Sequence, residues 1–137
     1  MLQENSKLLS IIIPVFNEVN FLYELFEQLK LHFNEANIEI IIVDDGSTDG
    51  SSSILKKIKE KNDFKFLFKI IKLDINSGKG KAIQTGIKHS AGEYILFQDA
   101  DLELDTKETV RLEYGLHHRV NFQNVQKKHE RFDLKLY

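Results

Sequence analysis

The stretch Ile38-Glu39-Ile40-Ile41-Ile42-Val43, followed by Asp44-Asp45-Gly46-Ser47-Thr48-Asp49-Gly50, decides the fold class of this chain. Its first part is a nearly continuous β-branched run, which is typical of a strand buried on both faces of a parallel sheet. Its second part is rich in residues that form turns and cap helices. Residues 51–61 then place their apolar side chains on one helical face. The stretch therefore predicts a strand, a loop and an amphipathic helix.

The same order of elements is predicted on both sides of this stretch. Residues 8–16 form another buried run, and residues 21–33 carry an apolar stripe at helical spacing. Further along, a strand is predicted within residues 64–73, a helix from a basic turn at residues 76–81 to about residue 89, and a strand at residues 94–98. Strands that alternate with helices predict an α/β fold with a doubly wound, mostly parallel sheet and helices on both faces.

Length and composition favour one domain of ordinary globular type. A chain of 137 residues is long enough for a single core, and its net charge of -2 gives no argument for a nucleic-acid partner. The absence of cysteine excludes disulfides and thiolate metal sites, and it fits a reducing compartment. No apolar run approaches the ~18 to 20 residues of a membrane span, and no signal peptide is evident. We therefore expect a cytoplasmic protein and leave peripheral contact with the membrane open.

Charge is distributed unevenly along the chain. The whole chain has 19 Lys/Arg and 21 Asp/Glu, whereas residues 111–137 have six basic residues against three acidic ones. We therefore predict a domain at residues 1–110 and a basic carboxyl-terminal tail of uncertain structure at residues 111–137. Within the tail, Leu112, Leu116 and Val120 have the spacing of a short helical stripe.

Acidic side chains follow three of the four predicted strands. They are Glu18 after the first strand, Asp44 and Asp45 after the second, and Asp99, Asp101 and Glu103 after the fourth. In open α/β sheets, ligands bind outside the carboxyl ends of the strands. The last three acids point to one side if the chain stays extended, and their oxygens suit Mg²⁺ or Mn²⁺. The pattern predicts a divalent metal on a diphosphate.

Structural roles for these residues remain alternatives. Asp44 or Asp49 is suited to capping the second helix, and Glu18 could stabilise the first helix by lying near its positive end. Lys79 and Lys81 are candidates for a supplementary phosphate contact, or else solvated turn residues. The glycines around them match neither the Walker pattern nor the dinucleotide-binding spacing.

Four ordered segments together resemble the family 2 glycosyltransferases. They are IIIPVFNE at residues 11–18, IVDDGSTD at 42–49, NSGKGKA at 76–82 and AGEYILFQDADL at 91–102. The nearest type is the polyprenyl-phosphate branch, which includes the dolichyl-phosphate mannosyl- and glucosyltransferases. The resemblance covers about residues 8–108 and implies a GT-A fold, a UDP- or GDP-sugar donor, and inverting transfer to a polyprenyl phosphate or another glycan acceptor.

The resemblance also implies roles for individual residues. The implied nucleotide-sugar contacts, with Lys79 added from its place in the basic turn, are Pro14, Phe16, Glu18, Val43, Asp45, Lys79, Asp99, Ala100 and Asp101. The implied metal ligands are Asp99 and Asp101 of an Asp-x-Asp motif, with Glu103 as a further metal contact. Asp44 is expected to support its loop.

The chain departs from the family after this motif. It ends about 34 residues beyond Glu103, so it resembles an enzyme truncated there, with a sheet incomplete at its carboxyl-terminal side and no recognisable catalytic base. The alternative function is a catalytically incompetent nucleotide-sugar-binding module, or a fragment that needs a partner chain. A nucleotidyltransferase is disfavoured, because that class would carry a glycine- and arginine-rich loop after the first strand. The oligomeric state stays open.

Overall fold

The computed structural model describes residues 9–98, residue 100, and three short strands at residues 109–111, 119–121 and 125–127. The main sheet has the order β3-β2-β1-β4-β7. Its strands are β1 (Leu9–Val15), β2 (Ile38–Asp44), β3 (Leu67–Lys72), β4 (Tyr94–Phe97) and β7 (Val125–Lys127). The first four are parallel, and β7 is antiparallel to β4.

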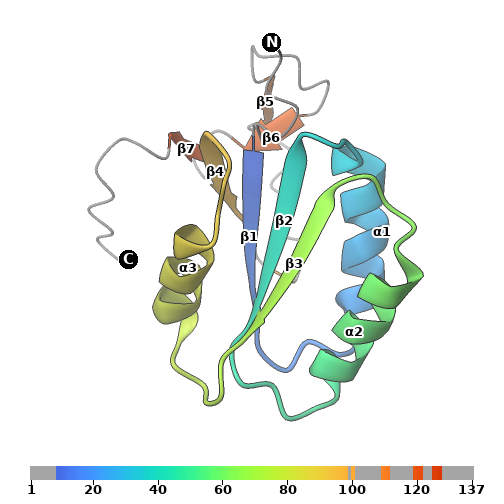
Figure 1. Ribbon diagram of the computed structural model, residues 1–137, viewed down its shortest axis with the longest axis vertical. Coiled ribbons are helices and arrows are strands. Elements are labelled where there is room, and N and C mark those ends of the chain that lie inside the picture. Colours follow the sequence, from blue (N-terminus) through green and yellow to red (C-terminus); the bar gives the residue numbers. More distant parts are fainter. Residues whose placement is uncertain (1–8, 99, 101–108, 112–118, 122–124, 128–137) are drawn as a thin grey trace.

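Helices cover both faces of this sheet (Figure 1). They are α1 (Leu22–Phe33), α2 (Ser51–Lys61) and α3 (Lys79–Lys88). α1 and α2 lie on one face and α3 on the other, as expected when right-handed crossovers run outward from β1 to β3 and then return to β4. The predicted alternation of strands and helices with a parallel sheet is confirmed.

The core follows from strands that are apolar on both faces. Ile11 and Ile13 of β1 pack on the side of α1 and α2, whereas Ile12 packs on the side of α3. β2 divides its side chains in the same way, with Ile40 and Ile42 on the first side. This alternation explains why the sequence shows continuous apolar runs instead of a polar and apolar alternation. Within the described residues, no helix is long and apolar enough to cross a membrane.

The packing of α3 on the sheet depends on Gly86. A Cβ atom added there would lie 2.5 Å from Cγ2 of Ile12 and 3.3 Å from Cγ2 of Val43, both fully buried. We expect Gly86→Ala to lower the free energy of unfolding by about 2 kcal/mol, because overpacking outweighs the gain in helix propensity. Urea denaturation would measure this loss. Thr85→Ala, on the partly exposed side of the same helix, should change stability little, and equal stabilities for the two variants would contradict the packing argument.

The described part of the predicted tail contains strands. β5 (Thr109–Arg111) and β6 (Arg119–Asn121) form a separate antiparallel pair, and β7 extends the main sheet beside β4. Val120 lies in β6 opposite Val110, so the predicted helical stripe does not extend to Val120, whereas Leu112 and Leu116 lie outside the described residues. Cross-strand pairing overrides spacing in so short a segment. The boundary between residues 110 and 111 stays a prediction.

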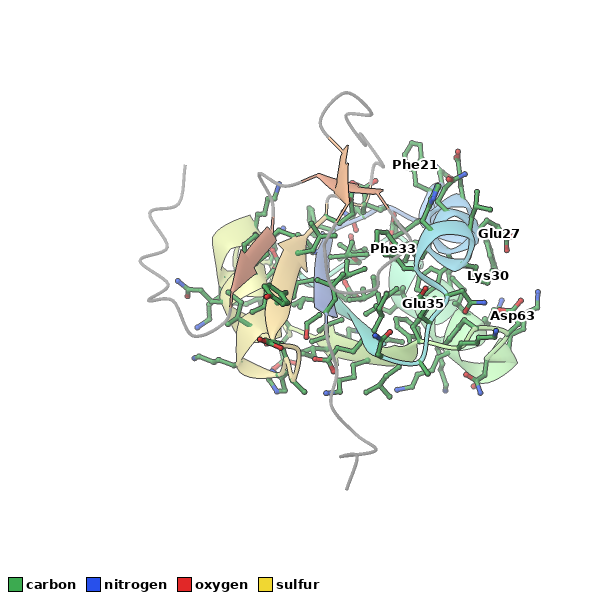
Figure 2. All side chains as sticks on the ribbon, turned by 90° about the horizontal axis from the view of Figure 1, so that it is seen from above. Phe21, Glu27, Lys30, Phe33, Glu35 and Asp63 are labelled. Carbon is green, nitrogen blue, oxygen red and sulfur yellow. The ribbon has the colours of Figure 1, made fainter. Side chains whose placement is uncertain are left out.

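An ion-pair cluster holds α1 to the corner between α2 and β3. Nζ of Lys30 lies 2.7 Å from a carboxylate oxygen of Glu27 and 3.0 Å from one of Asp63 (Figure 2). The Lys30 side chain is 19% exposed, so solvent screens these contacts less than at an open surface. Hydrogen bonds to Glu27 and Asp63 raise the pKa of Lys30.

A buried polar cluster lies at the opposite end of the sheet from the loops that follow β1 and β2. The carboxylate of Glu39, fully buried in β2, accepts hydrogen bonds from Oγ of Ser10 at 2.6 Å and from the main-chain N–H of Ala91. Its other oxygen lies 3.1 Å from Nζ of Lys69. We call these three side chains, together with the main chain of residues 89–92 that they hold, the Glu39 clasp.

The Glu39 clasp makes stability depend on pH. Burial acts to raise the pKa of Glu39, but the hydrogen bonds from Ser10, Ala91 and Lys69 outweigh it, so the pKa lies below its ordinary value of 4.5. The stabilisation is therefore present above pH 4.5 and is lost as the pH falls through the lower pKa of the folded state. We expect the stability difference between wild type and Glu39→Gln to shrink in acid. Denaturation at pH 7, 4.5 and 3 would measure it, and a constant difference would contradict the prediction.

Candidate functional site

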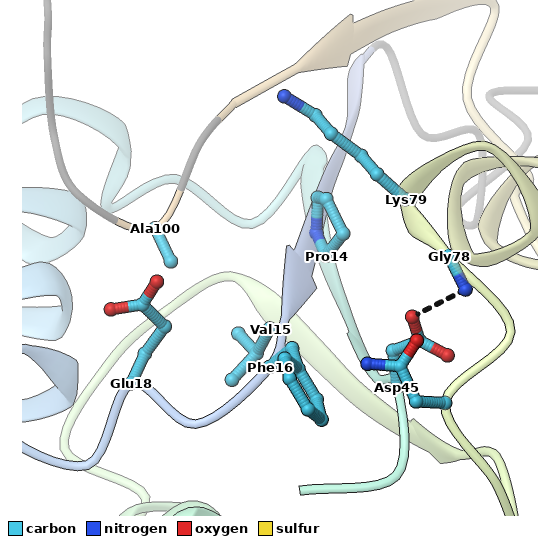
Figure 3. A pocket seen from close by; sticks show the side chains of 9 residues that line it. Pro14, Val15, Phe16, Glu18, Asp45, Gly78, Lys79 and Ala100 are labelled. Atoms are coloured by element: carbon cyan, nitrogen blue, oxygen red, sulfur yellow. Dashed lines mark hydrogen bonds between the residues drawn. The ribbon is translucent and has the colours of Figure 1, made fainter.

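A cavity of about 410 Å³ opens at the carboxyl end of the sheet. It lies beside the point where the strand order reverses, since the chain runs outward from β1 to β3 and then returns to place β4 on the other side of β1. Open α/β sheets bind ligands at such switch points. The lining residues are Pro14, Val15, Phe16, Glu18, Asp45, Asn76, Gly78, Lys79 and Ala100 (Figure 3).

Six of the predicted site residues line this cavity. They are Pro14, Phe16, Glu18, Asp45, Lys79 and Ala100. Lys81 is exposed and is not a lining residue. Asp99, Asp101 and Glu103 lie outside the described residues.

Val43 lies outside the cavity. Its side chain is fully buried among Ile12, Ile41 and Ala82, on the face of the sheet that α3 covers. The period of two in a strand turns this residue toward α3, and it is not among the residues lining the cavity. The side chain of Val43 therefore does not line this cavity, and the contact of Val43 with the nucleotide stays a prediction.

Three further lining residues were not among the predicted contacts. Val15 is the last residue of β1, and Asn76 and Gly78 lie in the loop between β3 and α3. Asn76 and Gly78 could have been predicted from the position of this loop, because it also follows the carboxyl end of a parallel strand. The loop's one acidic residue, Asp74, directly follows the predicted strand at residues 64–73 and was not counted in the acidic pattern.

Asp45 joins two of the loops that form the cavity. The residue is 3% exposed, and its carboxylate accepts hydrogen bonds from the main-chain N–H groups of Ser77, at 2.7 Å, and Gly78, at 2.9 Å. Its own N–H donates to the carbonyl of Val15 at 2.8 Å. The two loops can approach this closely because residue 46 is a glycine. A Cβ atom on Gly46 would lie 2.6 Å from the main-chain nitrogen of Asn76. Asp45 thus fixes the start of α3 against β1 and β2.

Asp44 and Asp49 serve the loop between β2 and α2. Asp44 accepts hydrogen bonds from the N–H of Ser47 and from Oγ of Ser52, which is the supporting role expected of it. Asp49 accepts from the N–H and Oγ of Ser51 and from the N–H of Val19. Burial acts to raise the pKa of Asp49, but these hydrogen bonds outweigh it and hold the pKa below its usual value. Asp49 therefore fits the structural alternative at the start of α2.

Asn17 holds the first loop against the second. Its φ of 52° lies in the left-handed region, which asparagine tolerates better than most residues. Its Oδ1 accepts a hydrogen bond from the N–H of Thr48 at 2.8 Å, and its N–H donates to Oγ of Ser47 at 3.0 Å. These bonds fix the main chain between Phe16 and Glu18, whose side chains both line the cavity. The cavity wall is therefore largely pre-formed.

The chemistry of the wall is mixed. Phe16 is 44% exposed and offers an aromatic face. Gly78 caps α3 and Lys79 is its first residue, so the positive end of the helix and an ammonium group line the same cavity as the carboxylate of Glu18. A helix start with a lysine favours phosphate groups, and an aromatic ring favours a planar base. The wall can therefore bind a ligand that carries both phosphate groups and a planar base.

The donor set suits a divalent cation. No group of three metal-ligating side chains occurs within the described part of the chain. Ala100 lines the cavity, however, and its covalent neighbours are Asp99 and Asp101, while Glu18 lies on the same wall. These groups supply only oxygen ligands, which hard cations such as Mg²⁺ and Mn²⁺ prefer. The residues present fit the predicted cofactor.

The protein is therefore a doubly wound α/β domain with a cavity of mixed polar and apolar lining at its switch point, where open α/β sheets bind ligands. The chain belongs to glycosyl transferase family 2, whose model matches residues 10–117. This finding confirms the resemblance of the four ordered segments.

Individual relatives agree with this assignment. Residues of this chain are 42% identical, over 100 positions, to dolichyl-phosphate beta-glucosyltransferase of Saccharomyces cerevisiae, covering 68% of this chain and 29% of the relative. Staphylococcus aureus TarS in complex with UDP-GlcNAc is similar in structure, with a TM-score of 0.61, 32% identity, and coverage of 69% and 26%. A mannosyltransferase from Pyrobaculum calidifontis, in complex with GDP-Man and Mn²⁺, shares the fold with a TM-score of 0.65, 24% identity, and coverage of 72% and 28%.

The chain matches only part of each relative. Its matches span between 17% and 32% of the lengths of the curated relatives.

Proposed function

We propose that residues 1–110 form the nucleotide-sugar-binding part of a metal-dependent glycosyltransferase. The observation that carries this proposal is the cavity at the switch point, with Phe16, Asp45, Lys79 and Ala100 on its wall. The similarity to TarS, a protein solved with UDP-GlcNAc, and to a dolichyl-phosphate glucosyltransferase supports a nucleotide-sugar donor. Residues 111–137 are proposed as a basic carboxyl-terminal tail, from which β7 joins the edge of the main sheet.

Each wall residue has a proposed part in donor binding. The exposed ring of Phe16 packs against the base, and Asp45 orders the two loops that meet around the base and ribose. Lys79 and the start of α3 favour the diphosphate through their positive charge. Asp99, Asp101 and Glu103 would hold a divalent cation, which when bound stabilises negative charge on the departing nucleoside diphosphate.

The proposed reaction is transfer of the sugar, with inversion, to a polyprenyl phosphate or another glycan acceptor. The dolichyl-phosphate relative supports this acceptor class. Such an acceptor would bring the site to the cytoplasmic face of a membrane. The second candidate function is binding of the nucleotide sugar without transfer, in a module that needs a partner chain.

One set of measurements tests both candidates. Calorimetry of the full chain with UDP, GDP, UDP-GlcNAc and GDP-mannose, each with and without Mn²⁺ or Mg²⁺, measures donor binding. Release of nucleoside diphosphate, with and without polyprenyl phosphate, measures turnover. We expect metal-dependent binding of at least one donor; release that depends on the acceptor would establish transfer, and binding without release would establish the binding module. No binding of any donor would contradict both.

A further inference from the structure

We infer that the Glu39 clasp positions β4 and, through it, Ala100 on the wall of the proposed donor site. Ser10, Glu39 and Lys69 are thus positioning residues for a cavity that opens at the other end of the sheet. This inference rests on the proposed function, because it assigns the segment after β4 to donor and metal binding.

The Glu39 clasp holds the connection between α3 and β4 at three successive points. Nζ of Lys69 donates to the carbonyl of His89 at 3.2 Å, and the N–H of Ala91 donates to the carboxylate of Glu39. Oγ of Ser10 accepts a hydrogen bond from the N–H of Gly92 at 2.8 Å. Because the hydroxyl of Ser10 also donates to Glu39, one network with a buried centre at Ser10 and Glu39 fixes the connection to β1 and β2, and the partly exposed Lys69 links it to β3.

Gly92 makes this close approach possible. A Cβ atom there would lie 2.5 Å from Oγ of Ser10 and 2.6 Å from its main-chain nitrogen. The second atom belongs to the backbone of β1, so a side chain at position 92 could be accommodated only by moving the connection away from the sheet. The start of β4 is therefore set by direct contact with β1.

β4 carries this position to the cavity. The strand has only four residues, which pair with β1 from Leu9 opposite Tyr94 to Ile12 opposite Phe97. The N–H of Gln98 then donates to the carbonyl of Ile12 at 3.0 Å, and Ala100 lines the cavity two residues later. A shift of one residue would move the following segment by about 3.3 Å and exchange the two faces of the strand. Besides its pairing with β1, this short strand has the three-residue antiparallel pairing with β7 to resist such a shift.

The charge of the Glu39 clasp supports a positional role over a purely stabilising one. Glu39 is fully buried, and a buried ion pair gains little stability over apolar residues of the same volume, because desolvation opposes the attraction. What the carboxylate provides instead is several acceptor positions with fixed directions. Two of its partners, Ser10 and Ala91, lie on opposite sides of the junction between β1 and the α3–β4 connection.

The test compares variants of the full chain that keep or break this contact. Glu39→Leu, Ser10→Ala and Gly92→Ala break it, whereas Glu39→Gln keeps an oxygen that can accept from Ser10 and Ala91. Lys30→Met is the matched control, since it removes a half-buried ion-paired lysine from α1, away from β4. Calorimetry measures the affinity for UDP or GDP with and without Mn²⁺, and hydrogen exchange measures protection of the amides of residues 94–97.

We expect the gain in affinity due to Mn²⁺ to fall about tenfold in Glu39→Leu and Gly92→Ala, the lower end of the loss seen when groups that orient metal ligands are removed. Affinity without Mn²⁺ should stay unchanged, protection of β4 should decrease, and Glu39→Gln should remain near wild type. Lys30→Met should keep the full gain even if it is less stable. If Glu39→Leu does not fold, Ser10→Ala and Gly92→Ala decide the question.

Two different results would overturn the inference. A wild-type gain retained in both Gly92→Ala and Ser10→Ala would contradict the positioning role while leaving the proposed function intact. A wild-type chain without any gain from Mn²⁺ would instead contradict the proposed function, and the inference with it.

Discussion

Asp101→Ala is expected to abolish the Mn²⁺-dependent part of nucleoside diphosphate binding. Asp101 is the second carboxylate of the proposed Asp-x-Asp motif, and its neighbour Ala100 lines the cavity. A site built from few carboxylates loses much of its charge and one of its fixed ligands when one of them is removed. We expect the affinity measured with Mn²⁺ to fall by about a hundredfold, to the level measured without the metal.

The control for this variant is Asp74→Ala. Asp74 is an exposed carboxylate in the loop after β3, so its removal changes the net charge equally at another strand end. Calorimetry with UDP and GDP at several Mn²⁺ concentrations would separate the two variants. An Asp101→Ala chain that binds the nucleotide with metal as tightly as wild type would contradict the assignment of the motif.

Asp45→Ala is expected to lower the free energy of unfolding more than any other change considered among the described residues. It would leave the N–H groups of Ser77 and Gly78 without their carboxylate acceptor, at a position that is 3% exposed. Hydrogen bonds to charged groups contribute about 1.5–3 kcal/mol each, although water can replace part of this where the loop opens. We expect a loss of about 3 kcal/mol in the free energy of unfolding. Affinity for the nucleotide should also fall, because the start of α3 is no longer fixed at the cavity.

A graded series tests this explanation. Asp45→Asn keeps one carboxamide oxygen for one of the two N–H groups and should fall between wild type and Asp45→Ala. Asp74→Ala is again the control, with stability close to wild type. Urea denaturation and hydrogen exchange of residues 77 and 78 are the measurements. If Asp45→Ala were as stable as Asp74→Ala, the carboxylate would not be what joins the two loops.

The order of elements could be predicted because its signals are local. A β-branched run such as residues 38–43 and an apolar stripe such as residues 21–33 each report their own conformation. The acidic residues after the strands could be predicted as neighbours for a related reason. Parallel strands bring their carboxyl ends to one edge, so Glu18 and Asp45 reach the same cavity from different loops.

Contacts between distant segments could not be predicted in this way. The sequence treats Val43 and Asp45 alike as residues at a strand end, but the cover provided by α3 buries the first, and the approach of residues 76–78 gives the second its partners. Glu39 is a single charge in an apolar run, and nothing near it in sequence identifies Ser10, Lys69 or Ala91 as its partners. The pairing of β7 with β4 could not be predicted either, because it involves only three residues of β7, which show no clear pattern in the sequence.

The sequence by itself determined the fold class, the family and the edge of the sheet where a ligand would bind, because periodicity and ordered motifs are properties of short segments. Only the tertiary structure decided which side chains line the cavity and which groups fix its loops. Those outcomes depend on which helix covers which face, and on hydrogen bonds between residues that are 30 or more positions apart, such as Asn17 with Ser47 and Asp45 with Ser77.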